Sequence, residues 1–345
     1  MNNNNLGNMP NDVVYNEKYG YISLKKLKMK LIRKDLSTTH LCVIAALVLS
    51  LGVSFLLSMF LSIAAPEMLI TTGIPPYLYY MINMFGSAFT IGMPFAVYLA
   101  FKGESVSNYL KFQRVRAFDS ILLILGAVAL WLLANFPSML IMELVESVGL
   151  DGGAQESLAG TNLFESILYI LTIAVFPPIF EEFAFRGVLL SSLRKHGDGI
   201  ALVASSVAFA LMHTSISSMP FALICGFAMG YVYLKTNNLW LSIAIHFVNN
   251  ANATLPGILY LYLPEATVNL ISNLIFYGLI LIGVVALIIL FATKKVFYTP
   301  ENERRSISYE LSAGSKTLAY ITSPGIIAVM ILTIGMIVFS MLGMY

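Results

Sequence analysis

Apolar segments close to the length of a membrane-spanning helix recur along the whole chain, and this pattern constrains the fold most strongly. A helix needs roughly 20 apolar residues to cross the hydrocarbon core of a bilayer. The segments near this length are residues 41–65, 78–101, 118–145, 163–193, 199–215, 220–235, 239–257, 269–293 and 324–345. With 58% hydrophobic and 11% charged residues, the sequence predicts an all-α, polytopic transmembrane helix bundle of about nine spans in the cell membrane.

The basic residues between these segments predict an orientation. Lys and Arg follow the second, fourth, sixth and eighth segments. The loops after the first, third, fifth and seventh segments contain neither residue: 66–77, 146–162, 216–219 and 258–268. Basic loops face the cytoplasm. We therefore expect a cytoplasmic N-terminus, with residues 1–35 as a polar and basic tail that does not fold alone, and residues 294–323 as a cytoplasmic linker.

Charge and cysteine content exclude several classes of partner. The formal net charge is only +2, and the basic residues lie in separate loops, so no nucleic-acid partner is expected. Cys42 and Cys225 both fall in apolar runs, which is not the spacing of a disulfide framework or a thiolate metal site. The expected surroundings are the lipid bilayer.

Three charged residues interrupt the fourth apolar segment. Glu181, Glu182 and Arg186 lie within it, although an ionised side chain in hydrocarbon costs on the order of 3 kcal/mol or more, which indicates a functional site. Glu182 and Arg186 are four residues apart and share a helix face, so we expect them to pair and leave Glu181 free as a general base. Pro177 and Pro178, just upstream, predict a kink or a fresh helix start that frees backbone carbonyls.

Two later segments each carry one histidine at helical spacing from a second residue. Phe209 and His213 are four apart, as are His246 and Asn250. By helical rise, Glu181 and His213 both lie about 20 Å from the basic helix ends, whereas His246 counts as shallower. A carboxylate with two histidines on different helices is typical of hydrolysis, although a single histidine can equally serve as an interhelical hydrogen-bonding residue. The remaining pair, His40 and His196, lies in charged, loop-like contexts, and no catalytic role is predicted for it.

The sixth segment contains Gly226 and Gly230, four residues apart. Small residues at this spacing let two helices approach closely. We interpret them as packing residues.

The three motifs, Glu-Glu-x-x-x-Arg, Phe-x-x-x-His and His-x-x-x-Asn in that order, resemble the signature of the CPBP family. This family comprises type II CAAX prenyl proteases and bacteriocin-processing enzymes and is also called the Abi family. The motifs lie within residues 177–250, and we expect the similarity to extend over about 160–255. The resemblance divides the chain into N-terminal transmembrane helices (36–158), a catalytic core (159–257) and C-terminal transmembrane helices (258–345).

The resemblance implies an intramembrane endopeptidase that acts on a membrane-associated peptide or protein. The asparagine-rich leader and the short loops indicate a bacterial protein. Glu181 and His213 would activate water, and His246 and Asn250 would stabilise the oxyanion. Glu182, Arg186 and Phe209 would then have supporting roles.

Alternatives remain for both the cofactor and the function. Zinc would take Glu181, His213 and His246 as ligands, but asparagine is a poor zinc ligand and a good oxyanion donor, so we favour a metal-free mechanism. Buried Glu and His chains also relay protons, which makes a proton-coupled transporter the second hypothesis. A noncatalytic membrane scaffold is the third.

Overall fold

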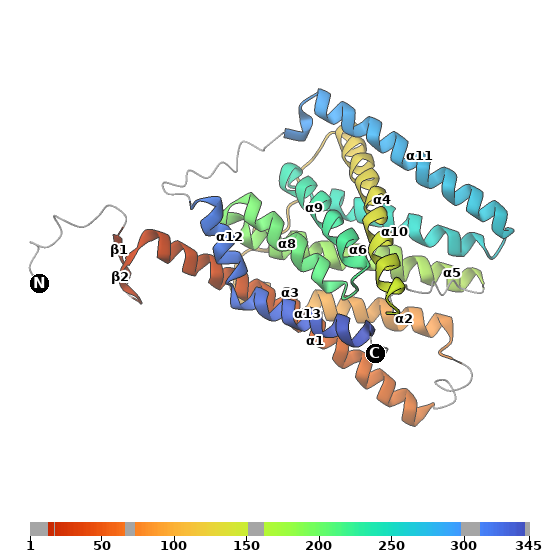
Figure 1. Ribbon diagram of the computed structural model, residues 1–345, viewed down its shortest axis with the longest axis horizontal. Coiled ribbons are helices and arrows are strands. Elements are labelled where there is room, and N and C mark those ends of the chain that lie inside the picture. Colours follow the sequence, from red (N-terminus) through yellow and green to blue (C-terminus); the bar gives the residue numbers. More distant parts are fainter. Residues whose placement is uncertain (1–12, 17, 66–72, 151–161, 298–310, 342–345) are drawn as a thin grey trace, which may run out of the picture.

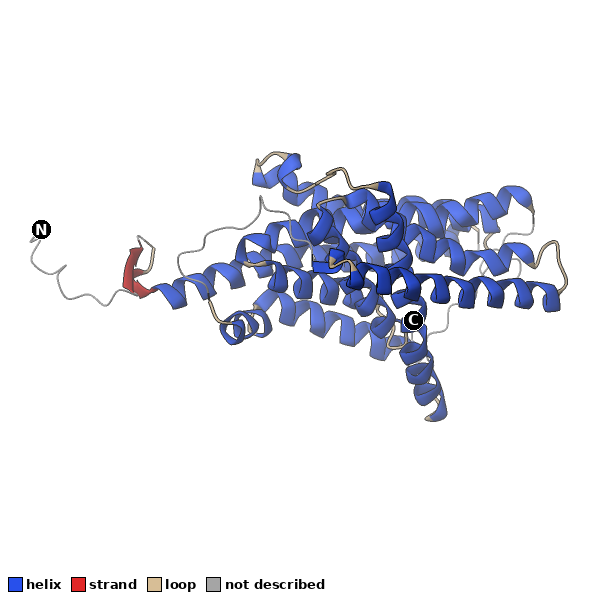
Figure 2. Ribbon diagram, turned by 90° about the horizontal axis from the view of Figure 1, so that it is seen from above, coloured by secondary structure: helices blue, strands red, loops and turns tan. Residues whose placement is uncertain are grey.

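The structure is a computed structural model that describes residues 13–16, 18–65, 73–150, 162–297 and 311–341. It is a bundle of helices, and Figure 2 shows that most of them run along the long axis of the molecule. A two-stranded antiparallel hairpin, β1 (Val13–Asn16) and β2 (Gly20–Ser23), precedes the bundle (Figure 1). The predicted all-α transmembrane architecture is therefore confirmed.

Thirteen α-helices make up the described part of the bundle. The α-helices are α1 (Leu24–Ala64), α2 (Pro76–Ser87), α3 (Met93–Lys102), α4 (Ala117–Ser147), α5 (Leu163–Ile170), α6 (Phe176–Glu182), α7 (Ser191–Leu193), α8 (Asp198–Met212), α9 (Ser218–Thr236), α10 (Leu239–Leu259), α11 (Glu265–Ala292), α12 (Ala313–Ile321) and α13 (Pro324–Met341). Three π-helices join them, η3 (Ala88–Gly92), η5 (Leu171–Val175) and η6 (Phe183–Leu190), and the 3-10 helices are η4 (Val106–Asn108), η7 (Arg194–His196) and η8 (Lys295–Phe297).

Seven helical stretches of the described residues are long and apolar enough to cross a membrane. They are Leu24–Ala64, Pro76–Lys102, Ala117–Ser147, Leu163–His196, Ser218–Thr236, Glu265–Ala292 and Pro324–Met341. The other two predicted spans are helical but do not meet these criteria. Helix α8 has only 15 residues, and α10 is interrupted by His246 and three asparagines. The estimate of about nine spans thus falls to seven by length and composition.

The basic helix ends gather at one end of the bundle. In α1, Asp35 Oδ2 lies 2.8 Å from the Nζ of Lys195, which ends the Leu163–His196 stretch. Arg194 donates from Nη1 to the Oδ1 of Asn237, after α9, over 2.6 Å. Basic residues that follow α3 and α11, together with Lys235 in the last turn of α9, line one cavity. These contacts agree with the alternation of loop charges, while the assignment of this end to the cytoplasm stays a prediction.

The glycines of α9 are packing residues, as expected. A Cβ on Gly226 would lie 2.9 Å from the Cα of Ser206, and one on Gly230 would lie 2.6 Å from the Cδ1 of Leu202. Both contacts are with α8, so the two helices approach backbone to backbone where larger residues would overlap. This packing also brings the Gly226 carbonyl within reach of the charged cluster described below.

Parts of the expected tail and linker have regular structure. Residues 13–16 and 20–23 of the tail form the hairpin, and residues 24–35 form the first turns of α1. The expected linker 294–323 contains α12, and its residues 298–310 lie outside the described part. His40 is not in a loop-like context: it is fully buried in α1, with Nδ1 2.8 Å from the Leu36 carbonyl oxygen.

Candidate active site

The charged residues lie on a helical stretch that contains two π segments. The stretch Leu163–His196 passes from α5 into η5, then through α6 and into η6. Pro177 and Pro178 occupy the first turn of α6, where a missing amide hydrogen is best tolerated. Glu181 and Glu182 close α6, and Arg186 lies in η6. Helix irregularities of this kind are frequent at functional sites.

Asn250 of α10 supplies a hydrogen bond that this helix cannot make for itself. The carbonyl oxygen of Ile173 would accept from the amide of residue 177 in an α-helix, and from that of residue 178 in a π-helix. Both are prolines and have no amide hydrogen. The Nδ2 of Asn250 donates to the Ile173 oxygen over 2.8 Å. The carbonyl freed by the proline pair is therefore satisfied by protein, and α10 is tied to η5.

Glu182 and Arg186 form a fully buried ion pair, as their spacing predicts. Arg186 Nη1 lies 2.7 Å from Glu182 Oε1, and both side chains are 0% exposed. Arg186 also donates from Nη2 to the Gly226 carbonyl over 3.2 Å, and its guanidinium lies 4.5 Å from the centroid of the Phe209 ring. Glu182 Oε2 and Arg186 Nε are buried without a hydrogen-bond partner among the described residues. The ion pair therefore does not satisfy all of its buried hydrogen-bonding atoms.

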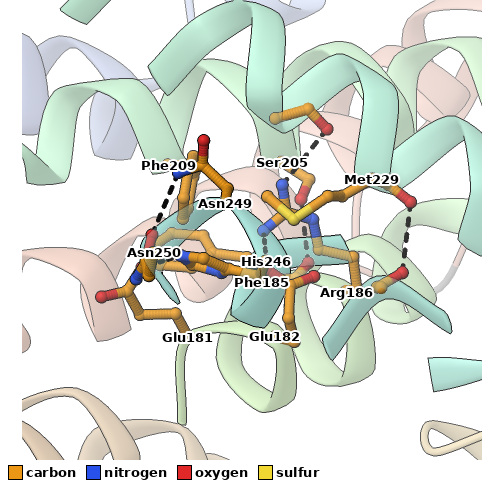
Figure 3. Close-up of polar contacts among 12 residues, drawn as sticks. Glu181, Glu182, Phe185, Arg186, Ser205, Phe209, Met229, His246, Asn249 and Asn250 are labelled. Atoms are coloured by element: carbon orange, nitrogen blue, oxygen red, sulfur yellow. Dashed lines mark hydrogen bonds and ion pairs between the residues drawn. The ribbon is translucent and has the colours of Figure 1, made fainter. Parts of the chain in front are cut away.

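His246 lies between the two carboxylates (Figure 3). Its Nδ1 is 3.0 Å from Glu182 Oε1, and its Nε2 is 3.8 Å from Glu181 Oε2. The ring is buried, edge-on to Trp131 at 5.5 Å and to Phe209 at 5.8 Å between centroids. The shallow position that residue counting gave His246 is therefore wrong, because this residue reaches both glutamates.

His213 lies at the C-terminal end of α8, close enough to Glu181 and His246 to interact with both electrostatically. It is exposed, and its Nδ1 lies 2.9 Å from the Phe209 carbonyl oxygen. Because a carbonyl oxygen only accepts, Nδ1 carries the hydrogen and Nε2 has a free lone pair. The ring also contacts the Phe209 ring, with centroids 4.9 Å apart. Phe209 therefore contacts both histidines and Arg186, which fits the supporting role predicted for it.

Asn249 and Asn250 form a pair of amides beside the histidine. Asn249 Nδ2 donates to Asn250 Oδ1 over 3.1 Å. Asn250 has two amide hydrogens, and Ile173 takes one of them. One hydrogen of Asn250 is therefore left for another acceptor, and the predicted oxyanion role stays compatible with a structural one.

Three side chains were named as alternative zinc ligands: Glu181, His213 and His246. The described residues contain no group of three or more His, Cys, Asp or Glu side chains placed to hold a metal ion. His246 has Nδ1 3.0 Å from Glu182 Oε1 and Nε2 3.8 Å from Glu181 Oε2. The metal-free mechanism remains a prediction, and no step below uses a metal.

Trp131 is a site residue that the sequence did not reveal. It is 1% exposed and packs against both His246 and Phe221. Its helix, α4, contains no charged or motif residue near it to mark this position, so only the packing of α4 beside α9 and α10 identifies it. Trp131 closes one side of the imidazole to solvent.

Comparison with known proteins identifies the segment that contains these site residues. Residues 163–252 match the family model of the Rce1-like type II CAAX prenyl endopeptidases. The match contains every residue predicted for the site. MroQ of Staphylococcus aureus (strain USA300), a membrane-embedded CAAX protease, is 29% identical over 134 residues, which are 35% of this chain and 54% of MroQ.

Two further relatives match a similar share. YdiL of Bacillus subtilis (strain 168) is 27% identical over 134 residues, covering 36% of this chain and 55% of YdiL. YxdF of Lactococcus lactis subsp. lactis (strain IL1403) is 35% identical over 106 residues, covering 30% of this chain and 56% of YxdF. The chain thus spans about half the length of these relatives. No solved structure matches it.

Proposed function

Because residues 163–252 belong to the Rce1-like family of type II CAAX prenyl endopeptidases, we propose that this chain is an intramembrane endopeptidase. Its substrate is a membrane-associated peptide or protein. The observation that carries the proposal is a row of four contacting side chains. It runs from Arg186 through Glu182 and His246 to Glu181. The inner end of the row is fully buried, whereas Glu181 at the outer end is 17% exposed. One end is therefore held in place while the other is open to water and substrate.

Glu181 is the proposed general base. It takes a proton from a water molecule whose oxygen attacks the carbonyl carbon of the scissile peptide bond, and the electron pair of the C=O bond moves to the carbonyl oxygen. His213 assists through Nε2, which has a lone pair because Nδ1 donates to the Phe209 carbonyl. As the tetrahedral intermediate collapses, the C–N bond breaks and Glu181 returns the proton to the leaving amine.

The negative charge on the carbonyl oxygen requires hydrogen-bond donors. We assign them to Nε2 of His246 and to the second amide hydrogen of Asn250. Glu182 accepts from the Nδ1 of His246, so the ring that stabilises the oxyanion carries a hydrogen on both nitrogens. The Glu182 contact also fixes the ring so that Nε2 is the nitrogen on the side of Glu181. Glu182 and Arg186 are thus positioning residues that act through His246.

The test compares membrane peptides of cells that express the intact chain or the Glu181→Gln variant. Peptide termini that depend on the intact chain should disappear in this variant. Glu165→Gln is the matched control, since Glu165 is a buried carboxyl residue at the start of the same helical stretch. It should keep those termini. A peptide pattern that does not change with Glu181→Gln at normal abundance would contradict the proposal.

The same experiment separates the two other hypotheses. A proton-coupled transporter would lose substrate flux in the Glu181→Gln variant without any change in peptide termini. A scaffold would lose neither flux nor peptide termini, because binding of a partner does not require a general base.

A further inference from the structure

A basic cavity lies at the end of the bundle where the basic helix ends gather. It has a volume of about 570 Å³ and is bounded by the start of α4 and the ends of α9 and α11. Among the described residues, its charged lining consists of five cations and one carboxylate: Arg114, Arg116, Lys235, Lys294, Lys295 and Asp119. Five positive charges less one negative charge leave +4 in one cavity.

This charge is not neutralised by the lining itself. The single carboxylate, Asp119, is already bound by Lys295, whereas Arg114, Arg116 and Lys294 are exposed. Arg116 is the N-cap of α4 and makes no capping hydrogen bond with its side chain. Arg and Lys side chains gathered in one cavity form a site for an anionic, phosphate-like group.

The walls of the cavity are fixed before any ligand binds. The backbone amide of Gln113 donates to the backbone carbonyl of Asn237 over 2.9 Å. The side-chain Nδ2 of Asn238 donates to the backbone carbonyl of Gln113 over 2.7 Å. On the other side, the Tyr231 hydroxyl donates to the Val296 carbonyl. The loop before α4 is thus held to the end of α9, and α9 to the segment after α11. These hydrogen bonds join the segments that carry the cations.

An apolar groove continues directly from the basic cavity. It has a volume of about 390 Å³ and lies between α4, α9 and α11. Leu123, Tyr231, Leu290 and Val296 line both spaces. Apart from the Tyr231 hydroxyl, its lining side chains are aliphatic or aromatic. One continuous site therefore has a strongly positive end and an apolar end.

We propose that this site binds one anionic phospholipid, with its phosphate in the basic cavity and an acyl chain in the groove. Basic pockets between transmembrane helices recognise lipid head groups by this chemistry. A free phosphate ion would leave the groove unused, and a zwitterionic lipid brings no net negative charge to the cavity, whereas an anionic phospholipid lowers its charge. An anionic phospholipid satisfies both ends, and the inference does not depend on the proposed peptidase activity.

The test measures lipid binding to the purified full-length chain by native mass spectrometry. Phosphatidylglycerol and phosphatidylcholine with identical acyl chains are the probes. The double variant Arg114→Gln/Lys294→Gln should bind phosphatidylglycerol about 30-fold more weakly, because each cation near an anionic surface contributes on the order of fivefold. Lys25→Gln/Lys26→Gln is the matched control, since it removes two exposed charges from α1, and its affinity should change by less than about twofold.

A second variant tests the groove separately. Ile224 is a half-buried residue of the groove wall, and Ile224→Trp should weaken phosphatidylglycerol binding about tenfold by filling the space of the acyl chain. Equal affinity for the two lipids in the intact chain would overturn the proposal. So would displacement of the lipid by millimolar inorganic phosphate, which would identify an ion site only, or unchanged binding in both test variants.

Discussion

The Nδ1 atom of His246 lies 3.0 Å from Oε1 of Glu182, the same oxygen that pairs with Arg186 at 2.7 Å. One carboxylate oxygen thus connects α10 to the helix that carries both glutamates. Because both contacts are buried, Glu182 cannot be removed without leaving the charge of Arg186 unpaired and the His246 ring free to turn. The two adjacent glutamates therefore have separable roles, and variants can distinguish them.

The first prediction separates the two carboxylates. Glu181→Gln should abolish cleavage with normal abundance and thermal stability, because Glu181 is the proposed base and is partly exposed. Glu182→Gln should lower the free energy of unfolding by about 3 to 5 kcal/mol, since it leaves a buried charge without its partner. Thermal melting and a cleavage assay on the same purified proteins check both. Equal losses of stability would show that the assignment of roles is wrong.

The second prediction concerns the donor at His246. A glutamine amide nitrogen can reach near the position of Nε2, whereas an asparagine amide nitrogen lies near that of Nδ1. If His246 donates to the oxyanion, kcat of His246→Gln should exceed that of His246→Asn by at least about tenfold, with similar KM. Equal kcat values in the two variants would contradict a donor role through Nε2.

The third prediction concerns the dual role of Asn250. Asn250→Ala should reduce turnover by about 10²-fold, the usual loss for one oxyanion donor. It should also lower the free energy of unfolding by about 1 to 3 kcal/mol, because the Ile173 carbonyl loses its partner. Pro177→Ala returns an amide hydrogen to the position that an α-helical Ile173 carbonyl would use. Adding it to Asn250→Ala should restore stability and leave turnover low.

Two results of the double variant would contradict the dual role of Asn250. If it regains turnover together with stability, Asn250 acts only by holding α10 to η5. If it regains neither, the Ile173 contact does not contribute to stability. Both quantities are measured on one preparation, by kcat and by thermal melting.

The fourth prediction concerns metal dependence. Enzyme treated with a strong chelator and then dialysed should keep its activity, because Glu181, His213 and His246 do not form a three-ligand group. Elemental analysis of active protein should find zinc well below one equivalent. Stoichiometric zinc that is lost in His213→Ala and His246→Ala would contradict the metal-free mechanism.

The fifth prediction concerns orientation. A tag inserted after Arg116 should be cytoplasmic, and tags in 66–77 or 146–162 should be external. A tag after Arg305, which lies outside the described residues, should also be cytoplasmic. Accessibility to a membrane-impermeant label in intact cells measures this. A cytoplasmic tag in 146–162 would overturn the predicted order of the spans.

Part of the site could be predicted from residue spacing. The pairing of Glu182 with Arg186 and the orphaned carbonyl below the proline pair both follow from local helix geometry. The partner of that carbonyl could not be predicted, since Asn250 is 77 residues away from Ile173. Such a contact depends on which helices pack together, and residue spacing does not specify that.

The predicted depth of His246 was wrong for a related reason. Residue counting assumes straight α-helices that start at a common plane, but the helix opposite His246 contains two π segments, and α10 packs against both of them. Likewise, charged neighbours in the sequence suggested a loop for His40, while tertiary packing buries it. Local composition was outweighed by helix packing in both cases.

The two π segments also have a consequence for aligning this helix with its relatives. Each amide of a π-helix bonds five residues back instead of four, so η5 and η6 each accommodate a residue that a plain α-helix would not need. A relative that is one residue shorter in 171–175, or after Arg186 in 183–190, can close the gap by returning to α bonding. A deletion in α6 between the segments would instead rotate Glu181 relative to Pro177. Alignment gaps in this helix therefore belong in the π segments.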